Sequence, residues 1–78
     1  MATAVRISGW RPGLRKVSIT QAIMRESGLG LRESKSCADR VLEGECVVVP
    51  VSDAHRARGL ARELESLGAK AEVVDDHA

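Results

Sequence analysis

Three stretches with helical spacing of apolar residues, each closed by a glycine, constrain this chain more than any other feature of its sequence. They cover residues 16–27, 31–42 and about 53–67, and Gly28, Gly44 and Gly68 follow them. Glycine adopts the left-handed conformation that ends many helices without a steric cost. In the third stretch Ser52 or Asp53 can cap the first turn, and an apolar stripe follows at Ala57, Leu60, Ala61, Leu64 and Leu67. We therefore expect three short amphipathic helices.

Three segments with the pattern of strands accompany these helices. Residues 4–10 alternate apolar and polar side chains, and residues 70–73 do the same near the end of the chain. Residues 46–51 are almost continuously apolar, which predicts a strand buried on both faces or nearly so, and Pro50 indicates an edge or an end of that strand. The order is β-α-α-β-α-β. It predicts an α+β two-layer sandwich, in which three helices cover one face of a three-stranded antiparallel sheet and leave the other face partly wet.

The length of 78 residues predicts a single domain over residues 1–78, with a core over about 4–75. A core of this size leaves little room for an internal catalytic cleft. No apolar run approaches the roughly 20 residues that span a bilayer, and residues 1–20 lack the pattern of a secretory signal. We therefore expect a soluble, cytoplasmic protein.

The charges are unevenly distributed. Residues 1–40 carry eight basic and three acidic side chains, and residues 41–78 carry four basic and eight acidic ones. Either the first half faces an acidic partner, or the two halves attract each other within the domain. Nucleic-acid binding is a further alternative, because seven cations gather in the first half: Arg11, Arg15, Lys16, Arg25, Arg32, Lys35 and Arg40. However, the only aromatic residue is Trp10, and the isoelectric point of about 7.8 is low for such a module.

The residues that commonly carry chemistry do not form a recognisable site in the sequence. Cys37, Cys46 and His55 are separated by nine residues each, whereas tight metal sites use shorter spacings. We expect both thiols to be reduced and to serve as small hydrophobic side chains. The acidic side chains of the third helix face water. We therefore predict neither an enzyme, nor a metal or cofactor site, nor a small-molecule substrate. Trp10 is either an exposed anchor for a partner or a cap on the edge of the core.

Two segments of the chain resemble a known family. Residues 28–35 (GLGLRESK) follow Lys16-Val17, and residues 63–73 read ELESLGAKAEV. Together they resemble the C-terminal domain of the bacterial ribosomal stalk protein, the L seven/L twelve protein, from Val5 to Val74. The adaptor of the Clp protease shares this fold, and residues 43–49 (EGECVVV) are similar to it. The acidic pocket with which that adaptor grips an N-terminal amine has no counterpart here, so only its architecture carries over.

The resemblance implies a non-enzymatic protein-interaction domain that recruits translational GTPases, such as elongation factors Tu and G, to the ribosome through its first helical hairpin. Val17, Leu31 and Lys35 match the family, whereas Thr20, Gln21 and Met24 replace an isoleucine, a lysine and an arginine of the contact face. The predicted partner-binding residues are Val17, Thr20, Gln21, Met24, Arg25, Leu31, Arg32 and Lys35. Met1 is followed by small residues close to the first strand, where the family has a dimerisation domain and a hinge, so we expect a free-standing relative.

Overall fold

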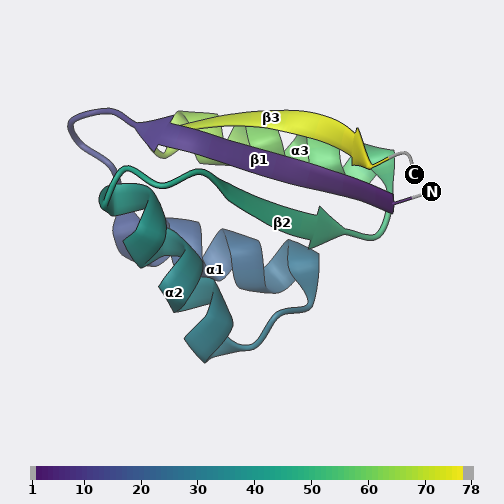
Figure 1. Ribbon diagram of the computed structural model, residues 1–78, viewed down its shortest axis with the longest axis horizontal. Coiled ribbons are helices and arrows are strands. Elements are labelled where there is room, and N and C mark those ends of the chain that lie inside the picture. Colours follow the sequence, from purple (N-terminus) through teal and green to yellow (C-terminus); the bar gives the residue numbers. More distant parts are fainter. Residues whose placement is uncertain (1, 77–78) are drawn as a thin grey trace.

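The chain folds into three strands and three helices in the predicted order. The computed structural model describes residues 2–76, which form β1 (Ala2–Trp10), α1 (Lys16–Ser27), α2 (Leu31–Leu42), β2 (Val47–Val51), α3 (Ala54–Ser66) and β3 (Ala69–Asp76) (Figure 1). The bounds of α1 and α2 are those that the apolar spacing and the glycines predict. Both pairings of the sheet are antiparallel, and its order is β2-β1-β3. The predicted fold class is confirmed.

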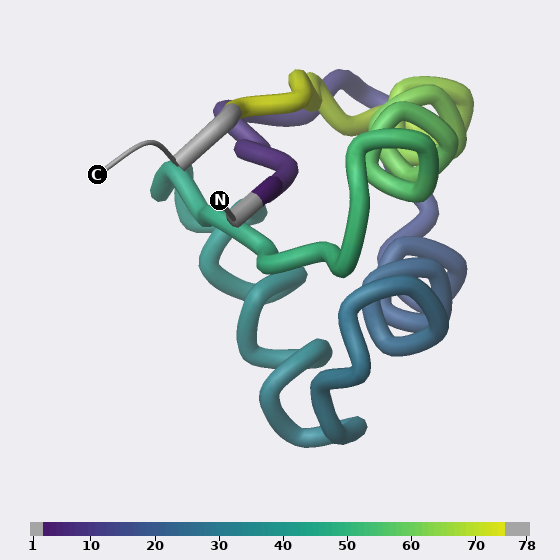
Figure 2. The backbone as a smooth tube through the Cα atoms, turned by 90° about the vertical axis from the view of Figure 1, so that its right-hand side faces the viewer, coloured from purple at the N-terminus to yellow at the C-terminus, as the bar shows by residue number. Residues whose placement is uncertain are grey.

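The helices cover one face of the sheet. Helix α3 packs on β3 and β1, α2 packs on β1 and β2, and α1 packs toward β2 (Figures 1 and 2). Val5 and Ile7 of the central strand are fully buried, and Leu60 and Leu64 of α3 and Ile23 of α1 belong to the same core. Helix α1 contacts both α2 and α3 and so lies between them. Within residues 2–76, no helix combines the length and the apolar character needed to cross a membrane.

Strand β2 differs from the prediction that it is buried on both faces. Val47, Val49 and Val51 are buried, but Val48 is 57% exposed and Pro50 is exposed. The difference arises because all three helices lie on one side of the sheet, so alternate side chains of β2 face water. β-Branched residues here reflect strand propensity rather than burial. Pro50 lies on an edge strand, as predicted. No strand pairs with the outer side of β2, so the missing N–H of Pro50 costs no hydrogen bond of the sheet on that side.

The two cysteines differ from each other in their surroundings. Both are free thiols. Cys37 is half-buried, and this burial raises the pKa of its thiol. Cys46 is exposed one residue before β2 begins, so the prediction that it serves as a small hydrophobic side chain is wrong.

The loop before α1 is fastened to the turn between α3 and β3. The Arg11 amide donates to the Gly68 carbonyl at 2.8 Å, and the Arg15 amide donates to the Leu67 carbonyl at 3.0 Å. The Arg11 guanidinium also donates to the Glu65 carboxylate at 2.9 Å and to the Ala69 carbonyl at 3.3 Å. These bonds fix the point at which α1 begins.

Gly68 is required for this contact by both conformation and space. Its φ is +99°, and a Cβ at this position would lie 2.9 Å from the Leu14 Cα. Backbone atoms cannot move aside as a flexible side chain can. Gly59 offers a comparison, because it lies within α3 and, apart from the adjacent backbone of that helix, no atom lies within 4 Å of the position of its missing Cβ.

We expect Gly68→Ala to lower the free energy of unfolding by about 2 kcal/mol or more, because it combines a strained left-handed residue with a backbone clash. Gly59→Ala is the matched control and should raise this free energy by about 1 kcal/mol, because alanine favours a helix over glycine. Urea unfolding followed by circular dichroism measures both. Equal effects of the two substitutions would contradict the contact at Leu14.

Glu65 provides a pH-dependent part of the same fastening. Its carboxylate accepts a hydrogen bond from the Ala71 amide at 2.9 Å, and this bond, followed by the one from Arg11, lowers the pKa of Glu65 below its usual value. A carboxyl with a lowered folded pKa stabilises the fold above its unfolded pKa, near 4.3. This contribution disappears as the pH falls through the folded pKa.

We therefore expect Glu65→Gln to reduce stability at pH 7 and to flatten the decrease in stability below about pH 4.3. Thermal unfolding between pH 2 and pH 7 measures this slope. Glu43→Gln is the matched control, because Glu43 is exposed and forms no ion pair among the described residues. A slope in Glu65→Gln as steep as that of the unsubstituted protein would rule out this role.

Candidate functional site: a groove between the first two helices

The hairpin that carries the candidate site is formed by local features of residues 27–31. Gly28 ends α1 with φ +76°, in the left-handed region. The Ser27 hydroxyl accepts a hydrogen bond from the Leu29 amide at 3.1 Å, and the Leu29 side chain packs against the core. Gly30 is extended, with φ −71° and ψ 171°, so α2 begins from a backbone conformation that any residue can adopt. The reversal of chain direction between α1 and α2 therefore depends on Gly28 and on the packing of Leu29 against the core.

A groove lies between α1 and α2. Its volume is about 300 Å³, and it is lined by Lys16, Val17, Thr20, Gln21, Leu31 and Lys35. Val17 is 71% exposed and Leu31 is 63% exposed, so two aliphatic side chains meet water at its walls. A single exposed aliphatic side chain is ordinary, but here two of them share one hollow, which is typical of a contact surface. Five of the eight predicted site residues thus line this single groove.

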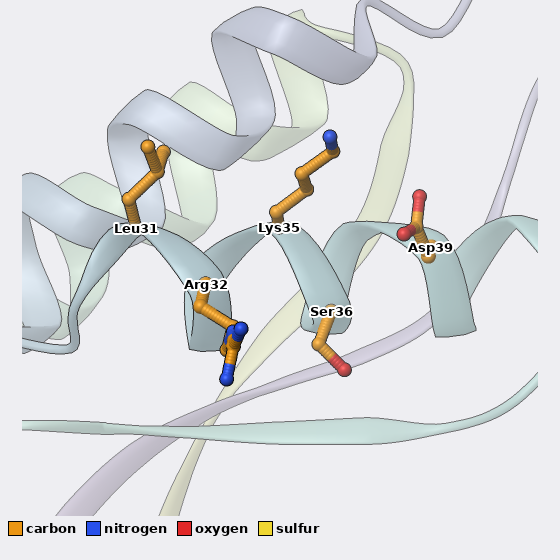
Figure 3. Close-up of a pocket in the computed structure, with 5 residues that line it drawn as sticks. All are labelled: Leu31, Arg32, Lys35, Ser36 and Asp39. Carbon is orange, nitrogen blue, oxygen red and sulfur yellow. The ribbon is translucent and has the colours of Figure 1, made fainter.

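Helix α2 presents a row of side chains toward α1. Leu31, Lys35 and Asp39 are four residues apart and point to the same side of the helix, whereas Arg32 and Ser36 point to the other side (Figure 3). The Lys16 ammonium on α1 forms an ion pair with the Asp39 carboxylate, which joins the two helices beside the groove. Lys35 forms no ion pair among the described side chains. The groove therefore has one paired cation and one free cation.

Thr20 contributes to the wall of the groove rather than to its polar surface. It is only 7% exposed, and its hydroxyl donates to the Lys16 carbonyl at 3.0 Å within α1. Its hydrogen-bonding capacity is thus used within the helix. Gln21, the next residue, is exposed and lines the groove with a neutral side chain.

Three predicted site residues lie outside this groove. Arg25 turns toward α3, where its guanidinium pairs with Glu63, and it also pairs with Glu26 at 3.1 Å. These two carboxylates, Glu63 first, raise the pKa of Arg25. Met24 is 36% exposed and does not line the groove. Arg32 lines a neighbouring hollow of α2 together with Leu31, Lys35, Ser36 and Asp39 (Figure 3).

Most cations of the first half are engaged within the protein. Ion pairs join Arg6 to Glu72, Arg11 to Glu65, Lys16 to Asp39, Arg25 to Glu63 and Arg40 to Glu45. Four of these five pairs join the two halves of the chain, which supports internal attraction over a cationic face for an external partner. Arg15, Arg32 and Lys35 remain without an ion pair among the described side chains. The clustered cations of residues 1–40 therefore offer a nucleic acid few unpaired charges among the described side chains.

Lys16 and Asp39 are site residues that sequence reasoning missed. Asp39 lies eight residues after Leu31, so helical spacing alone places it on the same side of α2. Its pairing with Lys16 depends on the packing of two helices, which no local pattern shows. Among residues 2–76, no group of three or more His, Cys, Asp or Glu side chains is arranged to hold a metal ion.

Sequence comparison identifies related proteins. Large ribosomal subunit protein bL12 of Bordetella avium (strain 197N) is 38% identical over 61 residues, which are 78% of this chain and 46% of that protein. The bL12 proteins of Bordetella pertussis (strain Tohama I) and Paraburkholderia phymatum (strain DSM 17167) show the same identity and coverage. The chain thus spans a little under half the length of these curated relatives. No protein-family profile matches it.

The fold and the groove define a small α+β domain whose first two helices present apolar side chains at the surface. The chain is related to the ribosomal stalk protein bL12, in that protein's C-terminal domain.

The inner side of the hairpin contains an unusual buried group. Ser34 on α2 is fully buried, and its hydroxyl has no hydrogen-bond partner among the described residues. A buried hydroxyl without a partner loses its hydrogen bonds to water and gains nothing in return.

We expect Ser34→Ala to raise the free energy of unfolding by about 1 kcal/mol, because it removes this unpaired hydroxyl. Ser36→Ala on the exposed side of α2 is the control, since it changes only helix propensity, by about 0.5 kcal/mol. Thermal and urea unfolding measure both. A gain for Ser34→Ala no larger than that of the control would show that the hydroxyl is satisfied in solution.

Proposed function

We propose that this chain acts as a protein-interaction domain of the translation machinery and docks a partner in the groove between α1 and α2. The named relatives are ribosomal proteins, which supports a place in translation. The proposal treats residues 1–78 as one domain that works in the cytoplasm by binding and not by catalysis. It requires no metal or cofactor.

The observation that carries the proposal is the combination of side chains in the groove. Val17 and Leu31 expose aliphatic surface on opposite helices, and Lys35 adds a cation that no described carboxylate neutralises. Burying two such side chains on binding gains about 1.5–3 kcal/mol each at most. A structural role does not explain their exposure, because both project from the core rather than into it.

The groove indicates the chemistry of the partner. An apolar side chain fits between Val17 and Leu31, and a carboxylate at its edge would meet Lys35. Lys16 is already paired with Asp39, and Gln21 is neutral, so the groove offers one free cation. We infer a helix with an apolar face and one acidic residue at its border, bound weakly and transiently over a small area.

The partner that we propose is a translational GTPase, in agreement with what the resemblance to the stalk protein implies. Of the remaining predicted contacts, Arg32 points to the other side of α2 from Lys35, so it would meet a carboxylate only on a partner that also covers the neighbouring hollow (Figure 3). Met24 is exposed on α1 but does not line the groove. Arg25 would first have to leave Glu63, so its contribution to binding is small.

We expect Val17→Asp combined with Lys35→Glu to abolish binding to elongation factors Tu and G, because the pair removes the apolar wall and reverses the free charge. The measurement is an NMR titration of the isotope-labelled chain with each purified factor bound to a GTP analogue. In the unsubstituted chain, the largest shifts should fall on residues 16–21 and 31–35.

The control is Val48→Asp combined with Lys70→Glu, which makes the same chemical changes at exposed positions of β2 and β3. This variant should bind as the unsubstituted chain does. Circular dichroism of both variants shows whether they fold. Unchanged binding by the groove variant, or shifts concentrated on the sheet, would reject the groove as the docking surface.

A further inference from the structure

The outward face of α3 carries cations, although residues 41–78 as a whole contain more acidic than basic side chains. Helical spacing places His55, Arg58, Gly59, Arg62 and Ser66 on one side of the helix, and all five are exposed. The opposite side carries the buried residues of α3. We name these five exposed residues the α3 stripe.

The acidic residues near the stripe are engaged elsewhere. The Asp53 carboxylate caps α3 by accepting from the Arg56 amide at 2.8 Å, and Glu63 pairs with Arg25. Glu65 accepts from Arg11 and from the Ala71 amide. The carboxylates that flank the stripe are therefore paired with other groups of the fold and not with the cations of the stripe.

Arg58 and Arg62 are left without compensation. Neither forms an ion pair or a side-chain hydrogen bond with another described residue. They are four residues apart, which places them on neighbouring turns about 6 Å apart along the helix. Residues 41–78, which contain more acidic than basic side chains, thus present a cationic face on α3.

Gly59 is a second and independent observation at the same place. A glycine inside an exposed helix costs about 1 kcal/mol relative to alanine. Apart from the adjacent backbone of α3, nothing lies within 4 Å of where its Cβ would be, so no packing against another element requires a glycine there. Its effect is to leave the helix backbone uncovered beside Arg58 and Arg62, where a flat, anionic partner can approach closely.

The composition of the stripe distinguishes between classes of partner. A protein interface is centred on buried apolar or aromatic side chains. The exposed large apolar residues of the described chain are Trp10, Val17, Met24, Leu31 and Val48, and none of them lies on α3. Arginine, in contrast, offers a planar fork that matches phosphate oxygens. A partner that offers phosphates without an apolar surface fits these observations best.

We propose that the α3 stripe binds the sugar–phosphate backbone of a nucleic acid through Arg58 and Arg62, with Gly59 allowing close approach. The contacts are to phosphate, so binding does not depend on base sequence. Two phosphate contacts give a slope of about −2 for the logarithm of the binding constant against that of the salt concentration. This inference does not depend on the groove.

The test is fluorescence anisotropy of short labelled oligonucleotides with the full chain at about 50 and 200 mM salt. We expect binding at the lower salt that weakens about tenfold at the higher one. Duplex RNA, duplex DNA and single-stranded RNA in separate titrations distinguish which backbone is bound. Absence of binding to all three at the lower salt overturns the proposal.

Two double charge reversals separate the stripe from the overall charge. Arg58→Glu with Arg62→Glu should weaken binding at least about tenfold at the lower salt, since both phosphate contacts become repulsive. Arg6→Glu with Arg40→Glu makes the same change in net charge at two exposed positions on β1 and α2, and should retain most of the binding. Equal loss in both variants would reveal diffuse attraction and overturn the proposal.

Two further measurements test the role of Gly59 and the class of partner. Gly59→Ala should weaken binding of the oligonucleotide while it raises the free energy of unfolding, a combination that loss of folding cannot produce. Polyglutamate should compete poorly, and competition at least as strong as that of RNA would assign the stripe to acidic polypeptides instead. The Arg58→Glu and Arg62→Glu variant should still bind through the groove, so failure of this proposal is distinguishable from failure of the proposed function.

Discussion

Burial of the inner face of β1 is the interaction on which the remainder of this structure depends. Val5 and Ile7 of this central strand are fully buried, and each helix packs on the same side of the sheet. A chain this short can build only one core, so each helix has one buried side and one free side. The free sides of α1, α2 and α3 are therefore available for other molecules without loss of stability.

The ion pairs decide what these free sides present. Four pairs join cations of the first half to carboxylates of the second, from Arg6 with Glu72 to Arg40 with Glu45. At exposed positions such pairs add little to stability, at most about 1 kcal/mol each. Their larger consequence is to remove charge from the surface. Among the described side chains, Arg15 before α1, Arg32 and Lys35 on α2 and Arg58 and Arg62 on α3 are cations without an ion pair.

Local sequence predicted most of the fold and part of the site. Gly28 and the apolar spacing gave both bounds of α1, because helix ends depend on residues close in the chain. The burial of β2 was overestimated, since the pattern VVVPV cannot show on how many sides a sheet is covered. The resemblance placed Val17, Leu31 and Lys35 on one surface, and the structure brings them around one groove. Pairings such as Arg25 with Glu63 join residues far apart in sequence, and no local pattern contains them.

The arrangement of the helices bears on how the two proposed surfaces would work together. Helix α1 separates α2 from α3 (Figure 2). Its Arg25 pairs with Glu63 of α3, whereas the groove lies between α1 and α2. A molecule in the groove therefore leaves the α3 stripe uncovered. With one free cation in the groove and two on the stripe, each surface alone binds weakly. On a target that contains both protein and nucleic acid, binding at one surface holds the other surface close to its own ligand. The effective concentration of that ligand can then reach about millimolar values. Two weak surfaces on one small domain would in this way select an assembly over either of its components.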